Sequence, residues 1–403
     1  MINLMKNTFY KEEETKKALC EFIRKSEKLS MGLKCKEFEK GFSEYQGRKY
    51  SVLYNSGSSA NLALIQSLIN LGILEKGDSV GFSALTWPTN VMPLIQLGLN
   101  PIPIDVSLEN LNVNLTNLKK VINHKSSFNF HVSGTSLEEV PIKALFITNL
   151  LGFCGDLDKI KEYCREKRII LLEDNCESLG SELKGTKLGN FGLASTFSFF
   201  VGHHLSTIEG GMVCTDDKDL YEMLLMVREH GWTRSSSEEN KSKLREKFRV
   251  DSFYERYTFY SLGYNLRPTE ITGFLGCEQL KYINEICNKR NKNFLYYENM
   301  TSGNPDLKKL NVSHINFVSN FAYPLIFNDK ETLDKNKKIF EGIEIRPIVG
   351  GFIVKQPFFK VEGYLTHRPK CPNAEKISEV SFYIPNNPDL TEEELEVICE
   401  LLK

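Results

Sequence analysis

Two adjacent histidines, His203 and His204, are the residues whose type and setting first suggest chemistry. They follow Ser195–Val201, where large apolar residues alternate with small polar ones as in a strand. A polar loop then ends at the paired glycines Gly210 and Gly211. An imidazole has an unperturbed pKa of about 6.5 and can therefore move protons near neutral pH. A packed and a solvated histidine would give the same pattern, so this stretch alone assigns no site.

A second stretch could bind an anion. Asn55-Ser56-Gly57-Ser58-Ser59 stands between a predicted strand at 52–54 and a predicted helix. Gly57 has no side chain and lets a ligand approach the backbone, while Ser58 and Ser59 place hydroxyls beside the free N–H groups of a helix start. The turn is therefore a candidate phosphate cradle. Serine-rich helix caps are also common where no phosphate binds.

Carboxylates follow the most apolar predicted strand, residues 169–173. Glu173, Asp174 and Glu177 lie at or just beyond its end, where open α/β sheets bind ligands. Carboxylates in this position are either functional or exposed at the rim of the sheet. Trp87, one of two tryptophans, follows another predicted strand and is either a stacking surface or a core residue.

The positions of these residues depend on the expected fold. Strands alternate with helices across residues 50–230, which predicts a mostly parallel sheet between two layers of helices, a three-layer α/β/α unit. We expect residues 1–260 to hold an N-terminal segment and this larger domain. Residues 261–403 predict a smaller α+β domain.

Several individual elements can be stated as expectations. Residues 87–97 are expected to form one helix, and residues 269–292 a long helix capped by Thr269. The final helix, 391–402, begins with a Thr-x-x-Glu capping box. The charged stretch 233–257 and the polar stretch 123–140 read as loops.

Composition limits the class of protein. The chain has 403 residues, 41% of them hydrophobic, and a formal net charge of −1, so charge gives no reason to expect nucleic acid or an anionic membrane as partner. No run approaches the roughly 20 apolar residues of a membrane helix, and the N-terminus lacks the apolar core of a signal peptide. We therefore expect a soluble cytoplasmic protein. No two of the ten cysteines are closer than ten residues, so no metal site is predicted.

Several motifs stand together in one order. They are NSGSSANLAL, TWPTN, TNLLG, LLEDNCESLG, FSFF with EGGMVCT, HGWTR, GYNLRP and GIEIRP. This set resembles the DegT/StrS family of sugar aminotransferases, which belongs to the fold-type I pyridoxal-phosphate enzymes. The resemblance covers nearly the whole chain. It implies an aspartate-aminotransferase-like fold and pyridoxal 5'-phosphate, or its pyridoxamine form, as cofactor.

The resemblance also implies which residues hold the cofactor phosphate. Carried over by position, Gly57, Ser58 and Ser198 become phosphate ligands. Asn265, in GYNLRP, would reach the phosphate bound by a second subunit. A homodimer with shared active sites is therefore implied.

Three further positions are implied to contact the cofactor ring. Asp174 becomes the partner of the ring nitrogen, and Trp87 the ring that stacks on it. Glu177 falls where the family has a polar residue near the phenolic oxygen. A carboxylate opposite the ring nitrogen keeps the pyridine protonated, and the protonated ring is the electron sink of this chemistry.

One position departs from the family pattern. Most members carry a lysine six residues before Glu-Gly-Gly, which binds the cofactor covalently. Here His203 stands six residues before Glu209, and no lysine lies between Lys187 and Lys218. This change resembles the 3-dehydratase subgroup, which makes 3-deoxy sugars. One of its two types carries an iron–sulfur cluster, which the cysteine spacing disfavours, and the other takes its amino group from L-glutamate.

The resemblance thus implies an enzyme of deoxysugar biosynthesis of the O-antigen or lipopolysaccharide type. It would remove the C3 hydroxyl of a nucleotide-linked 4-keto-6-deoxyhexose, with His203 as acid–base residue. We interpret His204 as a packing or orienting residue. Arg346 and the loop 234–257 are candidates for substrate contact, with a solvated surface role as the alternative for both.

Two other functions stay open. The first is a nucleotide-sugar aminotransferase with a histidine in place of the usual lysine. The second is a cofactor-binding regulator that lost catalysis with its lysine, which the retention of Asp174, Ser198 and an ionisable His203 disfavours. The nucleotide and the sugar configuration are not fixed by the sequence.

Overall fold

The computed structural model describes residues 1–122, 142–361 and 370–402. Its centre is a seven-stranded sheet in the order β1-β9-β8-β5-β4-β2-β3. The strands are β1 (Tyr50–Tyr54), β2 (Ser79–Ser83), β3 (Asn100–Ile104), β4 (Ile142–Thr148), β5 (Ile170–Asp174), β8 (Ala194–Ser198) and β9 (Gly211–Thr215). Only β9 runs antiparallel to its neighbours β1 and β8, so the predicted mostly parallel sheet is confirmed.

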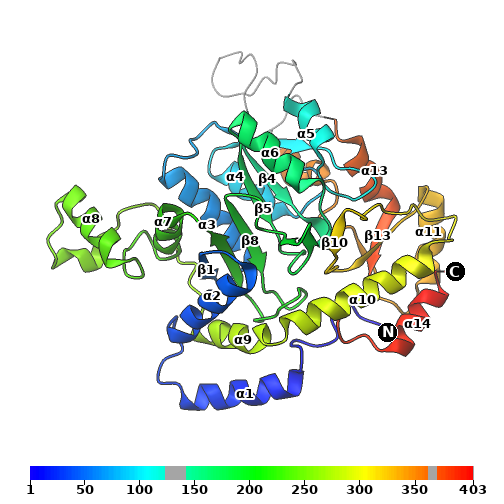
Figure 1. Ribbon diagram of the computed structural model, residues 1–403, viewed down its shortest axis with the longest axis horizontal. Helices are drawn as coiled ribbons and strands as arrows, with labels where there is room; N and C mark the ends of the chain where they lie inside the picture. The colour runs from blue at the N-terminus through cyan, green and yellow to red at the C-terminus, as the bar shows by residue number, and fades with distance from the viewer. Residues whose placement is uncertain (123–141, 362–369, 403) are drawn as a thin grey trace.

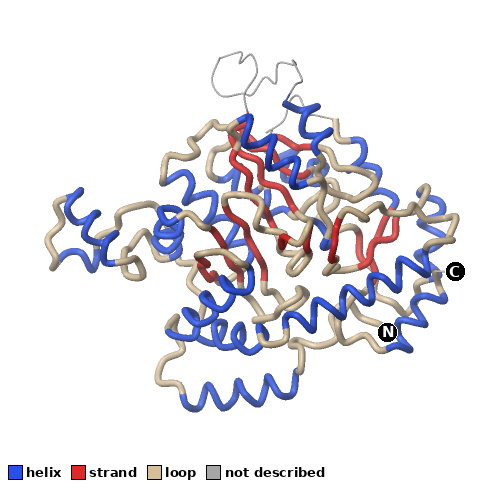
Figure 2. Tube along the Cα trace, viewed as in Figure 1, coloured by secondary structure: helices blue, strands red, loops and turns tan. Residues whose placement is uncertain are grey.

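Helices cover both faces of this sheet, as Figure 2 shows by the red strands between blue helices. The helices of residues 1–301 are α1 (Glu12–Lys25), α2 (Leu33–Gln46), α3 (Gly57–Asn70), α4 (Met92–Gln96), α5 (Leu115–Ile122), α6 (Leu157–Lys167), α7 (Lys218–Arg228), α8 (Glu238–Phe248), α9 (Glu270–Leu280) and α10 (Ile283–Thr301). Two of them do not cover the sheet: α1 packs against α9, and α8 projects away from the sheet (Figure 1). Successive strand residues point to opposite faces. Leu172 packs in the core beneath α3 and α7, whereas its neighbour Leu171 packs in the core that contains α6. The α/β/α architecture is thereby confirmed.

The C-terminal part of the chain builds a small antiparallel sheet in the order β11-β13-β12. Its strands are β11 (Tyr323–Ile326), β12 (Arg346–Pro347) and β13 (Ser381–Ile384), and its helices are α11 (Lys330–Ile339), α12 (Pro357–Val361), α13 (Pro372–Val380) and α14 (Glu392–Glu400). A third sheet, β10-β6-β7, joins β10 (Ile315–Phe317) to β6 (Glu182–Leu183) and β7 (Thr186–Lys187) of the earlier chain. The long helix α10 runs from α9 toward α14 beside the small sheet (Figure 1).

Three expected elements were wrong in detail. Residues 87–97 form a 3-10 turn, Pro88–Asn90, and a separate α4, because Pro93 cannot donate the hydrogen bond that would continue one helix. The expected helix 269–292 is divided into α9 and α10 at Lys281-Tyr282, although Thr269 caps α9 as predicted. Residues 233–257 contain α8, whose cap is Ser237. The predicted loop 123–140 lies outside the described residues.

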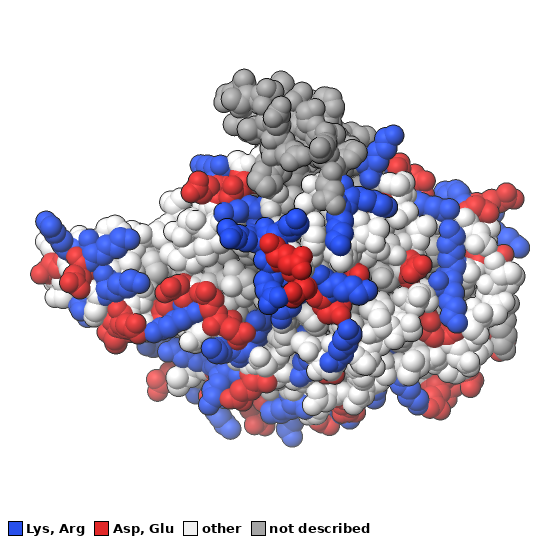
Figure 3. All heavy atoms as spheres, turned by 45° about the horizontal axis from the view of Figure 1, so that its top comes forward, with Lys and Arg blue, Asp and Glu red and all other residues white. Residues whose placement is uncertain are grey.

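The surface charge and the helix lengths can be compared with the expectation that neither nucleic acid nor a membrane is a partner. Basic and acidic side chains are interspersed on the face shown in Figure 3, in keeping with the net charge of −1. Within residues 1–122, 142–361 and 370–402, no helix combines the length and hydrophobicity needed to span a bilayer.

Candidate active site

Asp174 ends β5 and stands at the centre of the site. Its side chain is almost fully buried on the α3 face of the large sheet. Oδ2 accepts hydrogen bonds from Nδ2 of Asn61 (2.9 Å) and Nδ2 of Asn90 (2.7 Å), and Oδ1 accepts one from the backbone N–H of Cys176 (2.9 Å). Every one of these donors is neutral. Within the described part of the chain no cation pairs with Asp174, so the carboxylate keeps its negative charge available for a ligand.

Glu173, one residue earlier, points to the other face and has a different role. One oxygen accepts from Phe191 N (2.7 Å) and Gly192 N (2.8 Å), the other from Gly189 N (2.9 Å) and Asn149 Nδ2 (3.2 Å). This carboxylate is fully buried and saturated with donors. It therefore holds the 189–192 turn in place and is not open to a ligand.

The turn before α3 forms a tight cradle against the end of β8. Ser56 caps α3 by accepting from Ser59 N (3.1 Å), and α3 begins at Gly57. A Cβ on Gly57 would lie 2.7 Å from Cβ of Ser198, and one on Gly211 would lie 2.2 Å from the Ser56 carbonyl oxygen. Both glycines are thus required by close approach of backbone. The arrangement brings Ser198 to the first turn of α3.

The first turn of α3 places Ser58 beside backbone N–H groups that lack a partner within the helix. The Ser58 side chain is exposed, and no intrahelical acceptor exists for the first N–H groups of a helix. The helix dipole adds positive potential at the same point. The cradle formed by Gly57, Ser58 and Ser198 is therefore suited to a phosphate.

Trp87 lies in the turn that also supplies Asn90. Its side chain is 52% exposed, which excludes the alternative that it is a core residue. It precedes the 3-10 turn that brings Asn90 to Asp174 and Thr89 to Asn61. An uncovered indole in this turn is available to stack on a flat ligand.

Glu177 lies in the loop after β5 and is buried. Its Oε2 accepts from the backbone N–H of Leu151 (2.8 Å). Burial, with the nearby charge of Asp174, raises the pKa of this carboxyl to about 8. Leu151 itself adopts a left-handed backbone conformation (φ 56°), a strained geometry for a leucine, and so aims its N–H at Glu177. At neutral pH the Glu177 side chain is therefore mainly a carboxylic acid that can donate a hydrogen bond.

His203 lies in the turn after β8, half-buried against Phe321. The ring centroids of these two side chains are 5.2 Å apart, and Nδ1 of His203 is shielded from solvent without a hydrogen-bond partner. Burial, and next the positive charge of Arg290, lower the pKa of His203 to about 4, while a backbone interaction with Cys176 acts in the opposite direction. The imidazole is therefore neutral and able to accept a proton at physiological pH.

His204 points away from this space into the protein. It is buried, and its Nε2 lies 3.0 Å from the carbonyl oxygen of Ser319. Burial is the main cause that lowers its pKa well below the usual range. These contacts agree with the interpretation of His204 as a packing and orienting residue.

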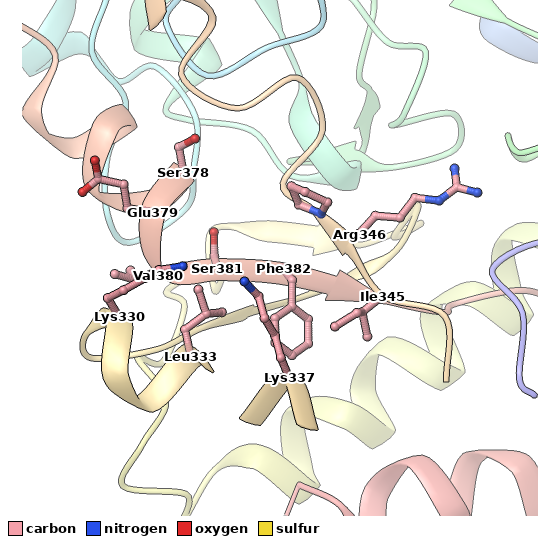
Figure 4. A pocket seen from close by; sticks show the side chains of 11 residues that line it. Lys330, Leu333, Lys337, Ile345, Arg346, Ser378, Glu379, Val380, Ser381 and Phe382 are labelled. Atoms are coloured by element: carbon pink, nitrogen blue, oxygen red, sulfur yellow. The ribbon is translucent and has the colours of Figure 1, made fainter. Parts of the chain in front are cut away.

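Arg346 lies on β12 at the edge of the small sheet. Its Nε and Nη2 donate to Oε1 of Glu344 (2.9 and 2.6 Å), and Glu344 Oε2 in turn accepts from the backbone N–H of Leu4. A cavity of about 550 Å³ beside it is also lined by Lys330 and Lys337. Figure 4 shows the guanidinium of Arg346 directed away from these lysines. Arg346 thus belongs to the rim of this cavity rather than to its floor.

Tyr383 connects Arg346 to the other site residues and was not recognised in the sequence. It faces Arg346 across the β12–β13 ladder, and its ring centroid lies 6.2 Å from that of Phe321, which contacts His203. Burial first, and then the charge of Glu177, raise the pKa of this phenol to about 12. The hydroxyl therefore stays protonated.

Asn265 is exposed at a different place. It forms an isolated antiparallel bridge with Glu229, and its Oδ1 accepts from Nε of Arg267 (3.0 Å). Its neighbour Leu266 accepts a backbone hydrogen bond from Asn55, just before the cradle. Among the described residues, no hydrogen bond joins Asn265 to Gly57, Ser58 or Ser198 of its own chain.

Arg234, the start of the second candidate substrate loop, lies at the same end of the molecule as Asn265. Its guanidinium stacks over Trp232, 3.9 Å from the ring centroid, with Tyr257 6.0 Å away. The strand-like bridge between Glu229 and Asn265 joins the two segments. No contact in the described chain links Arg234 to Asp174 or His203.

Comparison with known proteins places this geometry in a family. Residues 10–403 match the model of the DegT/DnrJ/EryC1/StrS aminotransferase family. A GDP-4-keto-6-deoxy-D-mannose 3-dehydratase of Yersinia pseudotuberculosis is 36% identical over 387 residues, which cover 94% of this chain and 93% of that protein.

Two solved structures are similar over the full length of both chains. One is a histidine-to-asparagine variant of GDP-4-keto-6-deoxymannose-3-dehydratase with bound GDP-perosamine (TM-score 0.86, 32% identity). The other is GDP-4-keto-6-deoxymannose-3-dehydratase with a trapped PLP-glutamate geminal diamine (TM-score 0.84, 31% identity).

Proposed function

The chain belongs to the DegT/DnrJ/EryC1/StrS aminotransferase family, and from this premise we propose that it is a pyridoxal-phosphate-dependent sugar 3-dehydratase. Its substrate is a nucleotide-linked 4-keto-6-deoxyhexose, from which it removes the C3 hydroxyl in deoxysugar biosynthesis. L-Glutamate is the amino donor, as the PLP-glutamate adduct of the similar structure suggests.

One observation carries this proposal: a neutral, half-buried histidine occupies the turn after β8, where the family places its lysine. No lysine lies between Lys187 and Lys218, so this stretch cannot bind the cofactor covalently. His203 can accept a proton but cannot replace the amine of a lysine. Proton transfer without covalent attachment fits elimination of a hydroxyl better than return of an amine to the sugar.

The residues present fit the cofactor at both of its ends. At the phosphate end, the Gly57 position leaves no space for a side chain beside Ser198, while the Ser58 side chain is exposed. We assign Gly57, Ser58 and Ser198 as phosphate ligands. At the ring end, Asp174 is a buried carboxylate held only by neutral donors, so it can pair with a protonated ring nitrogen.

Bound pyridoxal phosphate supplies an electron-accepting ring and, in its pyridoxamine form, the amine that reacts with the C4 ketone. Asp174 would hold the ring nitrogen, and Trp87 would stack on one face of the ring. Glu177 would donate its carboxylic O–H to the phenolic oxygen. His203, whose Nδ1 has no partner in the described structure, would accept the proton released from C4′ and return it to the C3 hydroxyl, which would leave as water. Acid–base catalysis of this kind contributes roughly 10²–10⁴-fold.

We also propose that the active unit is a homodimer in which Asn265 completes the site of the partner. Support comes from the exposure of large apolar side chains on the segment that leads to Asn265. Phe253, Tyr257 and Leu262 are 79%, 74% and 74% exposed. Several exposed large apolar side chains on one short segment favour a protein contact there.

Arg346 is proposed to contact the substrate. It lies at the rim of a cavity, and Glu344 and Leu4 fix its orientation. Through Tyr383 it is joined to the Phe321–His203 ring contact. An arginine fork is suited to phosphate or to a planar polar group.

A product assay tests the function. The enzyme is incubated with L-glutamate and a panel of 4-keto-6-deoxy sugar nucleotides that differ in nucleotide and sugar configuration. Release of ammonia with formation of a 3-deoxy-4-keto sugar supports the proposal. Accumulation of an amino sugar without ammonia would instead identify a sugar aminotransferase, and absence of turnover with every substrate would favour a non-catalytic role.

A further inference from the structure

Arg290 is a buried cation that the proposed reaction does not use. It lies on α10 and is 3% exposed. Arginines are almost never this buried unless they are paired, yet no carboxylate lies within ion-pair distance of it in the described chain. The groups that favour its charged form are the Cys287 thiol and, after it, Asp389. Burial lowers its pKa to about 10, so the guanidinium keeps its charge at neutral pH.

Backbone carbonyls take the place of a counter-ion. Nη1 donates to the carbonyl oxygens of Phe321 (2.7 Å), Asn386 (2.5 Å) and Asn320 (3.4 Å), while Nη2 donates to that of His203 (3.4 Å). Nε has no partner. One side chain therefore joins the histidine turn to the segments before β11 and after β13.

Neighbouring side chains strengthen this junction. The amide of Asn386 donates back to the Arg290 carbonyl (3.1 Å) and to Asn320. His204 contacts Ser319 in the same segment, and Phe321 carries the ring against which His203 packs. The position of the His203 ring thus depends on groups that Arg290 holds together.

The positive charge of Arg290 also affects the charge state of His203. Besides burial, the groups that act on the charge state of His203 are Arg290 from α10 and the backbone of Cys176 after β5. The adjacent His204 is itself kept neutral by burial. No carboxylate of the described residues acts on His203. A catalytic histidine usually has an orienting carboxylate, which stabilises the protonated ring. Among residues 1–122, 142–361 and 370–402, the one full charge that acts on His203 is the positive charge of Arg290.

We propose that Arg290 is a positioning residue for His203: its guanidinium fixes the histidine turn through the His203 carbonyl and places a positive charge beside that turn. This inference rests on the proposed role of His203 as the acid–base residue. Burying a charge that has no carboxylate partner is costly for folding. A positioning role of Arg290 toward His203 would explain why this cost is tolerated.

The test is a pH titration of His203 in the cofactor-free protein. NMR of ring-labelled histidines monitors the titration, and the signal of His203 is assigned by its absence in His203→Asn. In Arg290→Met, which removes the charge and the donors, the midpoint of His203 should rise by roughly one pH unit. In Arg290→Lys, which keeps the charge but not the fork, the midpoint should stay low. In Arg290→Lys we also expect kcat to fall about tenfold while KM stays within twofold of wild type, because the lysine holds the histidine turn less firmly.

Arg48→Met is the matched control. Arg48 is also a nearly buried arginine, and it donates to the carbonyl oxygens of Gly189 and Gly192. None of these partners belongs to the histidine turn. It should leave the His203 midpoint unchanged. A folded Arg290→Met protein with the wild-type midpoint would overturn the proposal, and so would wild-type kcat in Arg290→Lys. The titration needs no substrate, so it can succeed even if the enzyme proves not to be a dehydratase.

Discussion

Nδ2 of Asn90 lies 2.7 Å from Oδ2 of Asp174, and Asn61 donates to the same oxygen over 2.9 Å. Two amides from separate segments, the TWPTN turn and the first turns of α3, therefore fix one carboxylate without neutralising it. A buried charge held in this way is costly unless a cation eventually joins it. The arrangement is that of a site prepared for a protonated ligand.

Removing this carboxylate should empty the site of cofactor. Loss of one partner of a buried ion pair costs about 3–5 kcal/mol, so Asp174→Ala should purify without the visible absorbance of pyridoxal phosphate. Asp216→Ala is the control, since Asp216 is a half-exposed carboxylate paired with Arg48. Full cofactor content in Asp174→Ala would refute the assignment.

His203→Asn should keep the cofactor and lose turnover. The amide preserves the approximate size of the ring but cannot carry a proton, so kcat should fall by roughly 10²–10⁴-fold. His314→Asn serves as control, because His314 lies at a different place, with Nε2 3.0 Å from the Cys154 carbonyl. Cofactor content is measured by absorbance and turnover by ammonia release. Turnover at the wild-type rate would mean that another group is the base.

Subunit mixing tests whether Asn265 acts across a dimer. We expect His203→Asn and Asn265→Ala to be poorly active when each is alone. After denaturation and joint refolding, a mixed dimer has one site with an intact His203 and an intact Asn265 from the partner. Activity should therefore reappear in the mixture, up to about one quarter of wild type for random pairing of equal amounts. No recovery would place Asn265 in the site of its own chain.

The raised pKa of Glu177 predicts how stability depends on pH. The folded state binds this proton up to about pH 8, whereas the unfolded chain releases it near pH 4.5. Folding is therefore favoured most below pH 4.5 by this group, and its contribution is lost as the pH rises through 8, by at most about 1.4 kcal/mol per pH unit. Urea unfolding of the cofactor-free protein between pH 5 and 8 should show this slope. Glu177→Gln should abolish it, and an unchanged slope in that variant would contradict the assignment.

Glu173→Gln should lower stability rather than chemistry. The new amide N–H₂ would face backbone N–H groups that now donate to a carboxylate oxygen, so the free energy of unfolding should fall by about 2 kcal/mol or more. Glu162→Gln, at an exposed ion pair with Arg165, should change it by less than about 1 kcal/mol. Both are measured by thermal or urea unfolding. Loss of cofactor from a stable Glu173→Gln protein would show that Glu173 has a ligand role.

The sequence indicated several residues of the candidate site because the ends of strands can be recognised in it. The apolar run before Asp174 and the Ser-Gly turn before α3 indicated which residues meet at one edge of a parallel sheet. Asn61 and Asn90 were missed, since an asparagine on a helix or in a turn is ordinarily a solvated or capping residue. Both stood inside quoted motifs, which was the available signal.

Arg290 and Tyr383 could not be predicted as neighbours of the histidine turn, for another reason. Each comes from the C-terminal part of the chain, and its contacts with the histidine turn depend on how α10 and the small sheet pack against the large one. Local periodicity contains no information on that packing. The same limit explains the division of the expected helix 269–292, where the Lys281-Tyr282 step redirects the chain.

Glu173 and Asp174 are adjacent in the chain, yet the alternation of the strand sends one to the 189–192 turn and the other to the ligand site. If Asp174 holds the cofactor as proposed, both acids would be preserved in active relatives, Glu173 for the fold and Asp174 for the reaction. An invariant pair of acids in an alignment of relatives would therefore look like one catalytic motif. The direction of each side chain shows which acid is kept for folding and which for catalysis. A relative that has lost catalysis should therefore retain Glu173, whereas Asp174 should be replaced by other residues.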